Sequence, residues 1–184
     1  MKTTFHSVAE IYEALDESRA RLDATLAGLG PEQEALRDAP ERWSVAEIVE
    51  HVAIIEKQMG RLVGMLLAKA EADGAASPDA DAGPLVALDE VAERARREKY
   101  QAPEMAVPRG GASVSDSLAA LRESRAALTA LRHRVEAAGA ATHTYPHPAF
   151  GPLNLYQWLA FIGMHEERHL RQVESILEAQ AARG

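Results

Sequence analysis

Four stretches of the chain repeat apolar residues at the spacing of an α-helix, and this pattern constrains the fold more than any other feature. The stretches begin near residues 8, 43, 113 and 154. Apolar side chains that recur three and four positions apart cover one face of a helix. Because four such helices must bury these faces against each other, the sequence predicts an all-α four-helix bundle.

Capping residues mark where these helices begin and end. Ser44 and Glu47 form the pattern of a capping box at the start of the second helix, and Asn154 and Gln157 form an equivalent pattern at the start of the fourth. We expect the third helix to start at Ser113 or Ser115. The expected ends of helices one to four, in chain order, are Gly30-Pro31, Asp73-Gly74, Gly139 and about Glu178.

Two connections separate the later helices. Residues 74–114 carry Ala, Asp, Gly and Pro in loop-like clusters, and only the segment from Leu85 to Lys99 is capable of forming a helix. We therefore expect a long, partly helical crossover between helices two and three. Residues 140–153 contain three prolines and cannot remain helical. A length of 184 residues suits one domain that spans residues 1–184.

Composition excludes several classes of function. The formal net charge is −8, and Lys and Arg are scattered among more numerous carboxylates, so we expect no nucleic-acid partner. No apolar stretch is long enough to span a membrane, and residues 1–7 lack a signal-peptide core, so we expect a cytoplasmic protein. The absence of cysteine excludes disulfides and a thiol nucleophile within the protein.

Two histidines interrupt the apolar stripe of the fourth helix. His165 and His169 are one helical turn apart, so both imidazoles can reach a single ion. Buried histidines that bond to carbonyl or carboxylate oxygens would give the same pattern, and the pair alone leaves both interpretations open. His51 lies beside the stripe of the second helix and could face inward, although a single histidine of this kind is more often a structural residue.

Two segments resemble those that carry metal ligands in the DinB/YfiT-like superfamily. Residues 43–51 (WSVAEIVEH) resemble the capped helix with the first ligand, and residues 147–172, from HPAFGPL to HEERHLRQ, resemble the last helix with its paired ligands. The resemblance extends over essentially the whole chain and implies a DinB-like bundle that binds one divalent ion. By position, it implies that the metal ligands are His51, His165 and His169.

A three-histidine site leaves at least one coordination position for water or substrate, as catalytic metal sites do. The resemblance implies zinc or nickel, a small-molecule substrate and a homodimer. It suggests two enzyme classes, a thiol-dependent S-transferase that uses a low-molecular-weight thiol and a metal-dependent hydrolase. A non-enzymatic metal-binding or stress-response module is the alternative, and no catalytic residue is assigned.

The sequence HEERH also matches the H-E-x-x-H signature of zincin proteases, in which the glutamate activates a zinc-bound water. A zincin needs a third ligand downstream and a substrate-binding strand upstream. Only about fifteen residues follow His169, and we predict no strand before the helix. Glu166 and Glu167 are therefore interpreted as outer residues of a solvated helix.

Five other polar residues receive weaker predictions. Gln172 lies on the face of His165 and could orient a ligand, or it could be a polar residue at the bundle edge. We place His143 and His147 in a loop, at the rim of the site at most, because prolines keep them off a helix. We expect His6 and His133 at the surface.

Overall fold

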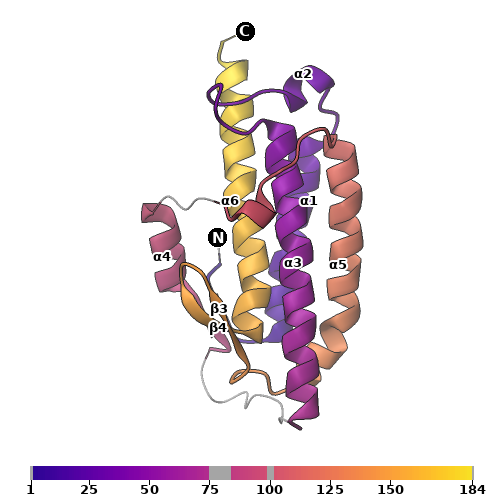
Figure 1. The fold of residues 1–184 in the computed structure, drawn as a ribbon, viewed down its shortest axis with the longest axis vertical. Coiled ribbons are helices and arrows are strands. Elements are labelled where there is room, and N and C mark those ends of the chain that lie inside the picture. The colour runs from indigo at the N-terminus through magenta and orange to yellow at the C-terminus, as the bar shows by residue number, and fades with distance from the viewer. Residues whose placement is uncertain (1, 75–83, 99–101, 184) are drawn as a thin grey trace.

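The predicted four-helix bundle is confirmed in a computed structural model, which describes residues 2–74, 84–98 and 102–183 (Figure 1). Each long helix contacts two others, in the cyclic order α1, α6, α3 and α5. The bundle helices are α1 (Val8–Leu26), α3 (Val45–Ala72), α5 (Val114–Ala137) and α6 (Leu155–Ala181).

Short elements connect the bundle helices. The antiparallel pair of β1 (Thr4–Phe5) and β2 (Val86–Ala87) joins the N-terminus to the crossover, and β3 (Thr144–His147) forms a hairpin with β4 (Gly151–Asn154). The remaining short elements are α2 (Pro31–Glu34), α4 (Asp89–Arg97) and the 3-10 helix η1 (Glu104–Ala106).

The crossover is long because α3 and α5 are parallel neighbours, both beginning at the end of the bundle where α2 lies (Figure 1). The chain must return along the length of α3, whose 28 residues span about 42 Å at 1.5 Å per residue. The crossover is partly helical, as predicted, and α4 lies within the expected segment. Residues 75–83 and 99–101 of this prediction lie outside the described residues.

The predicted caps form the expected bonds. The Ser44 backbone N–H donates to Glu47 at 2.7 Å, and the Asn154 backbone N–H donates to Gln157 at 2.9 Å. Ser113, rather than Ser115, caps α5. The first helix ends at Leu26, before the predicted Gly30-Pro31, because Ala27 is extended with a ψ of 123° and Gly28 follows with a left-handed φ of 75°.

The prediction that no strand precedes the fourth helix was wrong. Residues 140–153 contain β3 and most of β4, which pair antiparallel with Thr144 opposite Asn154. The hairpin is held by the helix that follows it, because the Trp158 indole donates to the Tyr145 carbonyl at 3.1 Å and Leu153 is buried. These contacts outweigh the low strand propensity of Pro146 and Pro152.

Apolar side chains from all four bundle helices form the core. Its largest fully buried members include Tyr12, Leu22, Ile48, Leu121 and Leu159. Among the described residues, no helix is long and apolar enough to cross a membrane.

Candidate metal centre

The bundle brings the three predicted histidines together. His51 comes from the second turn of α3, and His165 and His169 come from the middle of α6, a helix that packs against α3. One ring nitrogen from each residue lies within 4.8 Å of the other two. His51 and His169 are buried, and His165 is partly exposed. This is the only such group of three or more potential ligands among the described residues.

Hydrogen bonds assign the ring nitrogens of two of the histidines. His51 Nδ1 lies 2.7 Å from the Ala106 carbonyl oxygen, and His169 Nδ1 lies 3.1 Å from the Gln172 amide oxygen. Because both oxygens accept, both Nδ1 atoms carry the proton, and each Nε2 atom keeps its lone pair. His51 Nε2 lies 3.2 Å from His165 Nε2. Gln172 therefore orients His169, one of the two roles considered for it.

Burial keeps the three imidazoles neutral. Desolvation lowers the pKa of His51, and it lowers the pKa of His169 to about 3, with the neighbouring His51 adding to the effect. The pKa of His165 is held well below its usual value, first by desolvation and then by the two other histidines. Neutral imidazole is the form that binds metals.

Trp43 is a neighbour of the site for which the sequence pattern predicted no role in the site. Trp43 is the residue before the N-cap of α3, and its ring centroid lies 4.8 Å from that of His51. The indole covers one side of the histidine and contributes to its desolvation. The W-S-x-x-E pattern could have indicated this position, since a residue before the cap packs back onto the first turns of its helix.

Comparison with known proteins assigns the family. The sequence model of the DinB superfamily matches residues 14–173, which is most of the chain. The chain belongs to the DinB superfamily. It is 29% identical to the uncharacterized protein YuaE of Bacillus subtilis (strain 168), over 89% of this chain and 94% of that protein.

A solved structure shows the same fold as this DinB-superfamily chain. The crystal structure of TT2238, described as a four-helix bundle protein, matches with a TM-score of 0.60. The two sequences are 23% identical, and the match covers 92% of this chain and 99% of TT2238. At this identity the likeness concerns the fold alone.

The interpretation of Glu166 as a solvated residue was wrong. Only 1% of Glu166 is exposed, because α6 directs it into the bundle, where Arg19 donates to it at 2.6 Å and Ser18 at 2.6 Å. The same Arg19 also contacts Glu56 at 2.6 Å. Arg125 completes this network with contacts to both carboxylates. Two arginines and two glutamates from all four bundle helices therefore balance their charges in the core.

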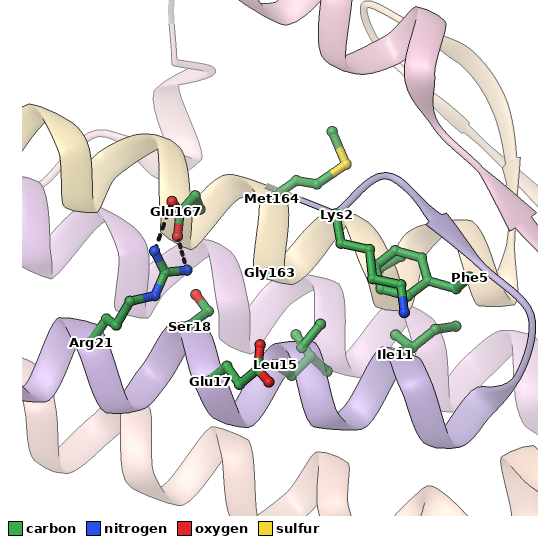
Figure 2. Close-up of a pocket in the computed structure, with 12 residues that line it drawn as sticks. Lys2, Phe5, Ile11, Leu15, Glu17, Ser18, Arg21, Gly163, Met164 and Glu167 are labelled. Atoms are coloured by element: carbon green, nitrogen blue, oxygen red, sulfur yellow. Dashed lines mark hydrogen bonds and ion pairs between the residues drawn. The ribbon is translucent and has the colours of Figure 1, made fainter.

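Glu167 is also buried rather than solvated. It pairs with Arg21 of α1 and Arg171 of α6, and it borders a small pocket between these helices that none of the three histidines lines (Figure 2). The two glutamates of HEERH thus point toward arginines. A 100° rotation per residue places them on other faces of α6 than His165 and His169.

The remaining histidines do not belong to the group of three, although His147 is near enough to His165 to help lower the pKa of that residue. His143 is buried and contacts Asp73 at 2.9 Å, while His6 and His133 are exposed as predicted. His147 lies in β3, where its ring packs against Phe150, Trp158 and Phe161. We predicted a loop residue at the rim of the site at most; the loop was wrong for His147, because the hairpin folds this residue onto α6.

Proposed function

We propose that this chain is a metal-dependent enzyme that binds one divalent ion, zinc or nickel, through His51, His165 and His169. The observation that supports the proposal most strongly is the convergence of three neutral imidazoles from two rigid helices. Hydrogen bonds to Ala106 and Gln172 already orient two of them, as partners of metal-bound histidines do.

The spacing of the nitrogens suits an ion. The two Nε2 atoms of His51 and His165 are 3.2 Å apart, and His51 Nε2 carries a lone pair. Such atoms repel each other unless a proton or a cation lies between them. Zinc–nitrogen bonds of about 2.1 Å in a tetrahedral site place ligand nitrogens roughly 3.4 Å apart. A shared ion would therefore need little movement of these two rings.

Among the described residues, only the three histidines belong to the proposed site, which leaves a coordination position of a bound ion open for water or substrate. When bound, a divalent ion of this kind lowers the pKa of a coordinated water or thiol and makes it a better nucleophile. The contribution of the protein is to hold three neutral nitrogens in place, with the Trp43 ring packed against that of His51. We propose a small-molecule substrate.

Metal analysis of the purified protein tests the proposal. We expect close to one zinc or nickel ion per chain, and we expect His51→Ala, His165→Ala and His169→Ala each to weaken binding at least tenfold, since one of three ligands is lost. His133→Ala, an exposed histidine of α5, is the matched control and should bind as the parent does. Full metal retention by the three ligand variants would overturn the site.

The same titrations separate this site from a zincin. A zincin would use Glu166 as the base and would not need His51. The structure instead places Glu166 in the ion-pair network with Arg19, where its oxygens are already occupied. Metal affinity of His51→Ala equal to that of the parent, at unchanged helicity, would favour a zincin.

A thiol titration separates the proposed reaction classes. The chain has no cysteine, so a thiol that reached the ion would have to come from solution. In a cobalt-substituted sample, we expect a low-molecular-weight thiol to change the visible spectrum if the enzyme is an S-transferase. An unchanged spectrum would favour a hydrolase or a non-enzymatic metal-binding module.

A further inference from the structure

Three side chains of α3 fasten one segment of the crossover over the candidate site. We call this segment, residues 104–111, the strap; it begins with η1, which contacts α3 near the middle of the bundle (Figure 1). Gln58 donates to the Met105 carbonyl at 3.2 Å, and His51 Nδ1 donates to the Ala106 carbonyl at 2.7 Å. Glu50 accepts from the backbone of Arg109 at 3.0 Å and of Gly110 at 3.1 Å.

The Glu50 contact depends on the backbone of the strap. Both carboxylate oxygens of Glu50 bind consecutive N–H groups, so the side chain holds the strap at two points. Gly110 and Gly111 have φ values of 76° and 91°, which favour glycine and turn the chain toward α5. Glu50 therefore fastens one end of the strap, and Gln58 fastens the other.

The strap contacts the candidate site through Ala106. This residue is fully buried, and its carbonyl is the hydrogen-bond partner of His51 Nδ1. The acceptor at Nδ1 decides which nitrogen of a neutral histidine keeps its lone pair. A displaced strap would remove that acceptor, and the proton could then occupy Nε2, the atom that faces His165.

We propose that Glu50 is a positioning residue that acts through the strap: by holding Arg109 and Gly110 it keeps the Ala106 carbonyl on His51 and so presents Nε2 to the metal. This inference rests on the proposed function for the identity of the ligand atom. The tautomer of His51, however, is a property of the metal-free protein and can be measured without metal.

The test is a long-range ¹H–¹⁵N spectrum of the metal-free protein, which reports which imidazole nitrogen carries the proton. We expect the parent to show His51 protonated at Nδ1. Glu50→Ala should shift a substantial fraction of His51 to the Nε2-protonated form and weaken metal binding about tenfold, the usual effect of losing a partner of a metal ligand. Glu50→Gln keeps one acceptor oxygen, but its amide NH2 would face the second backbone N–H, so it should restore only part of both properties.

Two further variants make the result specific. In Gly110→Ala, the new Cβ meets no neighbouring atom, but the φ of 76° is strained for alanine. This variant should therefore displace the strap through its own backbone, with Glu50 intact, and shift His51 toward the Nε2-protonated form. Glu71→Ala removes a carboxylate of the same helix that pairs with Arg134 of α5 and should leave His51 unchanged. Circular dichroism verifies that each variant is folded.

The outcomes distinguish the two proposals. A parent that binds no metal but shows the expected tautomer shift in Glu50→Ala would refute the metal site and support the positioning role. If Glu50→Ala and Gly110→Ala both keep the parental tautomer, and Glu50→Ala keeps the parental affinity, the positioning role is wrong whatever the metal does.

Discussion

Adjacent residues of α6 have opposite surroundings. His165 faces His51 of α3, while Glu166, the next residue, faces Arg19 of α1. Each residue turns the side chain by about 100°, so one helix supplies both a candidate ligand and a member of the core ion-pair network. The HEERH pattern identifies these residues but does not show which partner each one meets.

Glu166→Gln should destabilise the protein strongly. The substitution leaves two buried arginines against one carboxylate, Glu56, and removing one partner of a buried ion pair commonly costs about 3–5 kcal/mol. Urea denaturation measures the free energy of unfolding. Glu71→Gln is the control, since its exposed pair with Arg134 should contribute no more than about 1 kcal/mol. Equal losses in the two variants would contradict the role assigned to the network.

At the scale of elements, the β3–β4 hairpin packs His147 against α6. Its ring lies 4.6 Å from Phe150, 5.3 Å from Trp158 and 4.9 Å from Phe161, measured between centroids. The Ala149 backbone N–H donates to its Nδ1 at 3.1 Å. Desolvation in this position lowers the pKa of His147 to about 4. The hairpin therefore contains a neutral histidine at pH 7.

This pKa makes stability depend on pH. The unfolded chain has a histidine pKa near 6.5, so between pH 6.5 and about 4 it binds a proton that the folded protein does not. The free energy of unfolding should fall as pH falls through this window, with His147 contributing up to about 3 kcal/mol.

His147→Phe keeps an aromatic ring in the cluster but removes the titration, so its metal-free stability should fall less steeply below pH 6.5. Urea denaturation at several pH values compares the variant with the parent. Both proteins keep the other histidines, so the difference between the two profiles reports the loss of His147 together with its effect on the neighbouring His165. Parallel stability profiles would show that His147 does not contribute.

For the whole molecule, the parallel arrangement of α3 and α5 requires the crossover, and the crossover exposes apolar side chains. Met105 is 73% exposed and Val107 is 43% exposed, on either side of the buried Ala106. Exposed apolar residues close together are common at protein interfaces. This part of the strap is the surface through which we expect the predicted homodimer to form.

Light scattering should therefore give about twice the chain mass of 19.9 kDa. Met105→Lys should shift the protein toward monomer, because a charge would be buried at the interface. Met65→Lys, at an exposed methionine of α3, is the matched control and should not change the mass. A monomer mass for the parent across a concentration series would refute the dimer.

The sequence by itself determined the four helices and most of their boundaries. Caps such as Ser44 with Glu47 act between residues three positions apart, so the pattern contains all the partners that the bond requires. The spacing of His165 and His169 likewise placed both on one face of a helix. His51 was less certain, since its pattern fitted a structural histidine as well as a ligand, and the resemblance to the DinB superfamily favoured the ligand.

Only the tertiary structure decided what surrounds these residues. The strap that meets His51 is 55 residues away in the chain, and Arg19 is 147 residues from Glu166. The hairpin forms against α6 although its prolines argue against strands. Burial, tautomer and charge pairing depend on such distant partners, because the free energy of a buried polar group is set by the groups that replace its water.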